Sequence, residues 1–169
     1  MSSATDRLSV RLSDGRDRDL GWFPTAANRL SNQTGTGTDI QRSRLWTLAV
    51  NRNQNLLGKC LVIANRPCGS IPELHAEEWS SLFEHLRQLT AALDAIFAPD
   101  AYNHAFLMNV DPQVHMHVIP RYASTRVWEG MRFHDPHWGG LFGTEQRLLS
   151  TEHLSRLSDA VRRALQLPA

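Results

Sequence analysis

The alternation of apolar and polar residues predicts two antiparallel strand pairs. Residues 44–50 (RLWTLAV) and 56–64 (LLGKCLVIA) are apolar runs of strand length on either side of a short polar turn, which is typical of a hairpin. Residues 102–109 (YNHAFLMN) and 113–119 (QVHMHVI) form a second such pair, joined by a short connection that contains a proline. We therefore expect an antiparallel sheet.

The segments between and after these pairs predict two helices. From Glu77 onward, large apolar residues recur at spacings of three and four, and the pattern stops at Ala98–Asp100, where a proline cannot continue a helix. A second amphipathic helix is predicted over residues 151–165. Residues 127–143 mix aromatics, glycines and a proline and predict an ordered irregular loop. The expected fold class is α+β, with one long helix packed on the sheet and a C-terminal helix.

The N-terminal part of the chain has a different composition. Residues 1–40 are rich in serine, aspartate, arginine, threonine and glycine, and residues 32–39 (NQTGTGTD) are typical of a flexible linker. We expect a flexible N-terminal extension over residues 1–40 and one folded domain over residues 41–169.

Composition and charge narrow the class of protein. The chain has 169 residues, which suits one domain, and a formal net charge of +1, which gives no reason to expect nucleic acid or a membrane surface as partner. Its two cysteines, Cys60 and Cys68, have no Cys-x-x-Cys spacing and suit a reducing, cytoplasmic setting. No apolar run is long enough to span a bilayer. We expect a cytoplasmic protein.

Candidate chemistry lies in the fourth predicted strand. Side chains alternate between the faces of a strand, so Gln113, His115 and His117 share one face, while Val114 and Met116 pack from the other. Three interpretations follow: both histidines are structural, they hold a metal ion, or one is a nucleophile. Third metal ligands would have to come from residues without a compelling spacing, namely His104, Asp111, Cys68, His134 and His137.

The stretch QVHMHVIPRY (residues 113–122) resembles the signature of the histidine triad (HIT) superfamily, and the likeness extends upstream to about Leu45. The resemblance implies a homodimer that binds a nucleotide as its small-molecule substrate. It also implies that His115 attacks the α-phosphate and forms a nucleotidyl-imidazole. By the same resemblance His117 lies near the phosphate and the leaving group, and Asn109 contacts phosphate. No metal or other cofactor is required in this scheme.

Other side chains extend this candidate site. Arg121 falls on the histidine face by parity and is a candidate phosphate donor, and Trp128 either stacks on a base or anchors its loop. Gln113 stands where the family has its first histidine; it can orient groups but cannot carry a proton at neutral pH. We therefore expect a nucleotide hydrolase or nucleotidyl transferase. The alternatives are a catalytically silent nucleotide binder and a histidine-ligated metal hydrolase.

Overall fold

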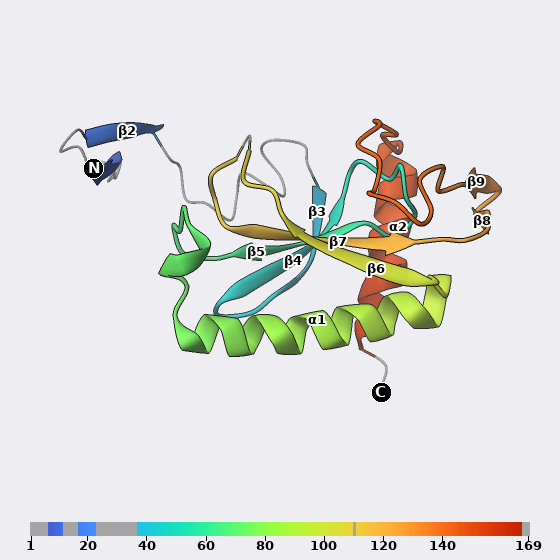
Figure 1. Cartoon of the computed structure of the whole chain (residues 1–169). Coiled ribbons are helices and arrows are strands. Elements are labelled where there is room, and N and C mark those ends of the chain that lie inside the picture. The colour runs from blue at the N-terminus through green and yellow to red at the C-terminus, as the bar shows by residue number, and fades with distance from the viewer. Residues whose placement is uncertain (1–6, 12–16, 23–36, 110, 167–169) are drawn as a thin grey trace.

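A five-stranded antiparallel sheet forms the centre of the molecule (Figure 1). The computed structural model describes residues 7–11, 17–22, 37–109 and 111–166. The sheet has the strand order β3-β4-β5-β7-β6, and every neighbouring pair is antiparallel. Its strands are β3 (Gly37–Arg42), β4 (Trp46–Asn51), β5 (Cys60–Ala64), β6 (Ala101–Phe106) and β7 (His115–Arg121).

The remaining elements are two helices, a 3-10 turn and two short strand pairs. The 3-10 turn η2 (Ile71–Glu73) precedes helix α1 (Ala76–Phe97), and helix α2 (Thr151–Leu165) follows the last strand. The two short pairs are β1 with β2 and β8 with β9, and their bounds are Arg7–Arg11, Asp17–Trp22, Arg126–Trp128 and Met131–Phe133. No helix in the described ranges is long and apolar enough to cross a membrane.

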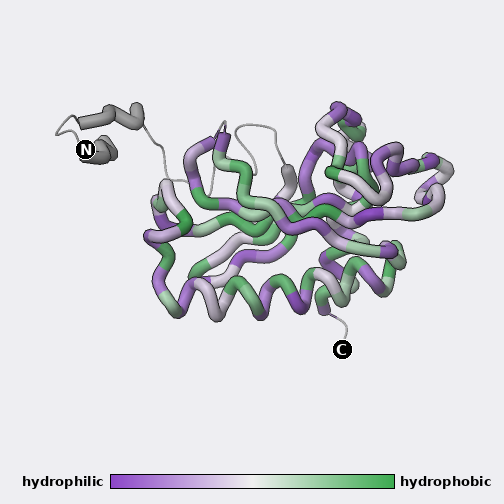
Figure 2. Tube along the Cα trace, in the orientation of Figure 1, coloured by the Kyte–Doolittle hydropathy of each residue, from purple (hydrophilic) through white to green (hydrophobic). Residues whose placement is uncertain are grey.

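Both helices belong to the main hydrophobic core, on one face of the sheet. Hydrophobic and hydrophilic positions alternate along α1 (Figure 2), and its buried side chains share that core with α2 and the strands. The strand residues on this face include Val114, Met116 and Val118, which brace the histidine strand from behind as predicted. The shared core contains Trp46, Leu48, Val50, Val62, Leu82, Leu89, Leu93, Leu154, Leu157 and Val161.

The opposite side of the sheet is the histidine face, which includes Ala49, Leu61, Ile63, His115 and His117. The strand register places Leu61 directly beside His117, and Ile63 directly beside His115. The three apolar members form a separate small buried cluster. An apolar surface therefore adjoins the two imidazoles.

Local capping fixes where the helices begin. At α1, the carboxylate of Glu78 accepts a hydrogen bond from the backbone of His75, and Arg66 binds the same carboxylate. At α2, the Ser150 hydroxyl accepts from the backbone N–H of His153. These bonds satisfy N–H groups that have no partner within the helix.

The predicted α+β fold is confirmed, with several differences in detail. Strand β6 ends at Phe106 rather than at Asn109, and β7 runs from His115 to Arg121 rather than from Gln113 to Ile119. The linker predicted over residues 32–39 is wrong for its last three residues, because Gly37–Asp39 pair with β4. Strand β5 begins at Cys60 rather than at Leu56, because Gly58 takes a left-handed conformation (φ 80°) in a turn. The loop predicted at 127–143 contains the hairpin β8–β9.

The proposed flexibility of the N-terminal extension stays a prediction. Residues 1–6, 12–16 and 23–36 lie outside the described part of the chain. What the structure adds is that the sheet already begins at Gly37, four residues before the predicted start of the domain at residue 41.

Candidate active site

The imidazole of His115 is held in one tautomer. Its Nδ1 lies 2.7 Å from the backbone carbonyl oxygen of Gln113. A carbonyl oxygen only accepts hydrogen bonds, so Nδ1 carries a proton, which in the neutral ring leaves the lone pair on Nε2. The residue is 4% exposed, so its protein surroundings rather than solvent hold the ring in this orientation. His115 thus has the geometry of an imidazole nucleophile.

His117 faces that lone pair. The Nε2 atoms of the two histidines are 3.2 Å apart. Since Nε2 of His115 accepts, Nε2 of His117 donates. Burial is the main cause that lowers the pKa of His117 to about 4, and the nearby positive charge of Lys59 adds a smaller effect. His117 is therefore a neutral hydrogen-bond donor at physiological pH.

The Gln113 side chain acts as a clamp between β7 and the segment after β5. Its amide nitrogen donates to the carbonyl oxygens of Ala64 (2.7 Å) and Arg66 (2.8 Å), and its amide oxygen accepts from the backbone N–H of Cys68 (3.3 Å). The backbone N–H of Val114 adds a bond to the carbonyl of Cys68. Gln113 therefore fixes the backbone whose carbonyl orients His115.

Lys59 is also part of the site, because its charge acts on His117, although the sequence pattern did not predict this. Its side chain is buried (7% exposed), and Nζ donates to Oδ1 of Asn55 at 2.8 Å. Burial lowers the pKa of Lys59 to about 8, against a raising effect of Glu145. A signal was present in the sequence: a lysine in an apolar run, with the same strand parity as Leu61 and Ile63.

Arg121 occupies a position different from the one expected. Its Nε donates to Asp135 at 2.6 Å, and its terminal nitrogens donate to Asp135, to the side chain of Asn103 and to the carbonyls of His137 and Gly140. The guanidinium is buried and its donors are engaged. Arg121 therefore anchors the loop 135–140 to the sheet instead of offering donors to a phosphate.

Among the described residues, neither Asn109 nor Trp128 is hydrogen-bonded to the two histidines. Asn109 is exposed in the turn beyond β6, where its backbone N–H donates to Leu107. Trp128 lies on β8 and packs against the main core, which favours the interpretation as a loop anchor. Figure 1 shows β8 and β9 beyond the C-terminal end of β7, whereas the two histidines lie in its first half.

The remaining titratable candidates lack the environment of a reactive group. Burial raises the pKa of Cys60 to about 12, and burial also raises the pKa of Cys68. His137 pairs with Glu145 on the loop after β9. Within the described ranges, no three histidine, cysteine, aspartate or glutamate side chains are grouped as metal ligands would be.

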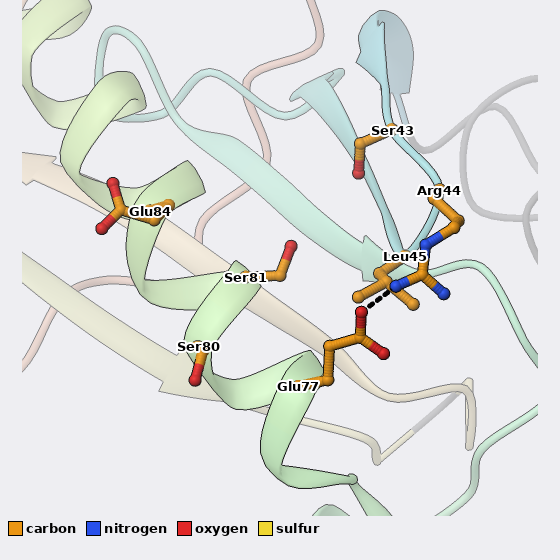
Figure 3. A pocket seen from close by; sticks show the side chains of 7 residues that line it. All are labelled: Ser43, Arg44, Leu45, Glu77, Ser80, Ser81 and Glu84. Carbon is orange, nitrogen blue, oxygen red and sulfur yellow. Dashed lines mark hydrogen bonds and ion pairs between the residues drawn. The ribbon is translucent and has the colours of Figure 1, made fainter.

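Two hollows in the described part of the chain are lined by residues other than the histidine pair. One of about 340 Å³ lies between the β3–β4 turn and the first turns of α1, where Arg44 and Glu77 form an exposed ion pair (Figure 3). The other, of about 320 Å³, is lined by Asn55 and Glu145, which are neighbours of Lys59, and by residues of the loop after β9. The second hollow is therefore next to two residues that interact with Lys59, namely Asn55 and Glu145.

Comparisons with known proteins agree with this architecture. The model of the HIT domain family matches residues 36–124, which is more than half of the chain. The chain belongs to the HIT domain family. No curated protein sequence matches it.

Solved structures of histidine triad proteins share the fold. One from Bradyrhizobium japonicum is 24% identical with a TM-score of 0.61, covering 80% of this chain and 95% of its own. A hypothetical histidine triad nucleotide-binding protein from Sulfolobus tokodaii is 16% identical with a TM-score of 0.61, covering 82% and 89%. A zinc-bound histidine triad family protein from Mycobacterium smegmatis is 16% identical with a TM-score of 0.55, covering 75% and 82%.

Proposed function

We propose that the protein is a nucleotide hydrolase or nucleotidyl transferase that acts at the α-phosphate through a covalent nucleotidyl-His115 intermediate. The observation that carries the proposal is the fixed tautomer of His115, whose Nδ1 donates to the Gln113 carbonyl and whose Nε2 keeps a lone pair. Membership of the HIT domain family supports it, as does the nucleotide-binding description of the Sulfolobus tokodaii neighbour. The substrates are dinucleoside polyphosphates, nucleoside phosphoramidates or similar nucleotides.

The first chemical step forms one bond and breaks one. Nε2 of His115 attacks the α-phosphorus while the bond from phosphorus to the leaving group breaks. Nε2–H of His117, which donates to His115 in the free protein, donates to a phosphate oxygen instead. A preset donor of this kind stabilises the charge that spreads over the oxygens in the transition state. Water or phosphate then attacks the intermediate and frees His115.

The test is to trap the intermediate. The purified protein is mixed with diadenosine polyphosphate or an adenosine phosphoramidate, quenched quickly and weighed by mass spectrometry. We expect a mass increase of one adenylate on the wild type and none on His115→Ala. Turnover that persists in His115→Ala would refute the proposal.

A catalytically silent nucleotide binder is the alternative that the glutamine at position 113 suggests. The Gln113 amide bonds to backbone groups on three residues, which is a positioning role that needs no titrating group. We therefore favour the enzyme. Measurable nucleotide affinity without product from any of these substrates would favour the silent binder.

We propose that the reaction needs no metal. The metal-hydrolase alternative expects stoichiometric zinc in the purified protein and loss of activity with a chelator. Turnover that EDTA leaves unchanged, in protein found free of zinc by elemental analysis, would remove that alternative.

We also propose that two copies associate through β6 and α1. Strand β6 is at the edge of the sheet, and beside it α1 exposes Trp79 (42%) and Phe83 (62%). The Trp79 ring contacts Phe106 of β6 edge to face, with centroids 6.1 Å apart. An unpaired edge next to exposed apolar rings is typical of an interface. Light scattering should give a dimer for the wild type and a monomer for Phe83→Glu.

A further inference from the structure

The proposed reaction leaves one proton unassigned. A departing amine or alkoxide must be protonated, and Gln113, at the first triad position, has no proton to give at neutral pH. His117 is neutral above its lowered pKa of about 4, so donating its remaining proton would create an unfavourable imidazolate. The histidine face needs another acid.

Lys59 lies where such an acid is required. Its carbonyl accepts from the backbone N–H of Asn51, so pairing with β4 continues one residue before β5 begins. Lys59 therefore shares the face of Leu61, the direct partner of His117. Residues in this diagonal relation are about 7–8 Å apart, within reach of a long side chain. The Lys59 side chain thus starts on the side of His117 that faces away from Gln113, and its charge acts on His117.

Two side chains hold Lys59 in this place, one at its backbone and one at its amine. The Gln54 amide nitrogen donates to the carbonyl of Lys59 at 2.8 Å, and Gln54 also accepts from the backbone N–H of Gly58. Asn55 accepts from Nζ of Lys59, and its own amide donates to the carbonyl of Gly143. The turn before β5 and the loop after β9 are thereby fixed around one buried amine.

We propose that Lys59 is the general acid and base of the reaction, the role that Gln113 cannot fill. The inference rests on the nucleotidyl-His115 chemistry proposed above. In the first step, a proton moves from the Lys59 ammonium to the leaving-group nitrogen or oxygen as its bond to phosphorus breaks. In the second step, water attacks phosphorus, the bond to Nε2 breaks, and the neutral Lys59 amine takes the proton of the water. Lys59 ends the cycle as an ammonium.

The charges around Lys59 suit this cycle. Burial brings its pKa down to about 8, so it is protonated at neutral pH and gives up a proton more easily than a solvated lysine. The groups that face it are His117 from β7, which is neutral, and Glu145 from the loop after β9, which raises the pKa of the amine. Glu145 is itself paired with His137.

The deciding experiment compares two leaving groups. An adenosine phosphoramidate releases an amine that must be protonated, whereas the 4-nitrophenyl ester of adenylate releases a stabilised anion. We expect Lys59→Met to lower kcat on the phosphoramidate about 100-fold or more, and on the nitrophenyl ester less than about tenfold. Equal losses on both substrates would overturn the proposal, since they would indicate a structural or purely electrostatic role.

A second variant separates charge from proton transfer. Lys59→Arg keeps a positive charge but does not release a proton in the working pH range. We expect it to show the same selective loss on the phosphoramidate, with nucleotide affinity and thermal unfolding close to wild type. Recovery of phosphoramidate turnover by Lys59→Arg would overturn the assignment of Lys59 as an acid.

The pH profile provides a third readout. Because the acid must be protonated, wild-type phosphoramidate turnover should fall as pH rises through about 8, the pKa of Lys59. This descending limb should be absent with the nitrophenyl ester. His115→Ala, run in parallel, should abolish turnover of both substrates. If His115→Ala leaves both rates intact, the nucleotidyl-histidine proposal fails whatever Lys59 does.

Discussion

The two ends of strand β7 carry polar side chains on one face, yet the structure uses them in opposite ways. At its start, His115 donates through Nδ1 to a carbonyl, and its Nε2 lone pair accepts only from the neutral His117. At its end, Arg121 binds Asp135, Asn103 and two loop carbonyls through all of its guanidinium nitrogens. Both residues are buried. Burial and parity therefore do not define a reactive group, because the hydrogen-bond partners decide which atoms remain available to a ligand.

Removing the His115 imidazole should have the largest effect on turnover. His115→Ala should reduce turnover by about 10⁴-fold or more, because no other group on the strand replaces the nucleophile. It should lower the free energy of unfolding by only about 1–3 kcal/mol, because the buried Gln113 carbonyl loses its donor. Steady-state kinetics and urea unfolding measure the two quantities. Unfolding of this variant, rather than loss of turnover alone, would contradict the contrast between His115 and Arg121.

Breaking the ion pair between Arg121 and Asp135 should lower stability much more than turnover. Asp135→Asn leaves the buried guanidinium of Arg121 without its counter-charge and should lower the free energy of unfolding by about 3–5 kcal/mol. Turnover per folded molecule should change much less. The matched control is Asp100→Asn, which breaks the more exposed Arg126 pair and should cost about 1 kcal/mol or less. Similar losses for both variants would contradict the role assigned to Arg121.

Substitutions of Gln113 test whether the hydrogen bonds of its side chain affect the reactivity of His115. Gln113→Leu leaves the buried carbonyls of Ala64 and Arg66 without a donor, which should cost about 1–3 kcal/mol of stability. It should also lower turnover moderately, because the Gln113 carbonyl that orients His115 is no longer held. Gln113→His tests whether an imidazole at the first triad position raises activity. Unchanged kinetics in Gln113→Leu would separate the clamp from catalysis.

The neutral state of His117 should be visible in the pH dependence of stability. The folded pKa of His117 is about 4, below the ordinary value of 6.5, so between these values the unfolded chain binds a proton that the folded chain does not. The free energy of unfolding should therefore fall as pH decreases from 6.5 towards 4. His117→Gln should show a shallower fall in this window by calorimetry. Identical slopes would contradict the neutral state assigned to His117.

Much of the fold was predictable because its signals are local. The spacing of apolar residues in α1 and the alternation in β7 predict both elements, since each pattern is set by the geometry of the element itself. Strand β3 was missed because glycine and threonine at its start are equally typical of a linker. Its pairing with β4 depends on residues elsewhere in the chain.

The candidate site was predictable in part for the same reason. Alternation alone placed Gln113, His115 and His117 on one face. It also assigned Arg121 to phosphate, because parity cannot show that Asp135 reaches it from a later loop. Lys59 was missed because its position beside His117 follows from the pairing of β5 with β7.

The sequence alone predicts most of the elements, but not β3 or the β8–β9 hairpin, together with the direction in which each side chain leaves its strand. Both follow from backbone geometry over a few residues. The tertiary structure alone decided the tautomer of His115 in its buried setting, the neutral state of His117, the clamp made by Gln113 and the burial of Lys59. These properties depend on hydrogen-bond partners and desolvation. Both come largely from segments far apart in the chain, such as the contact of Gln113 with Arg66 across 47 positions.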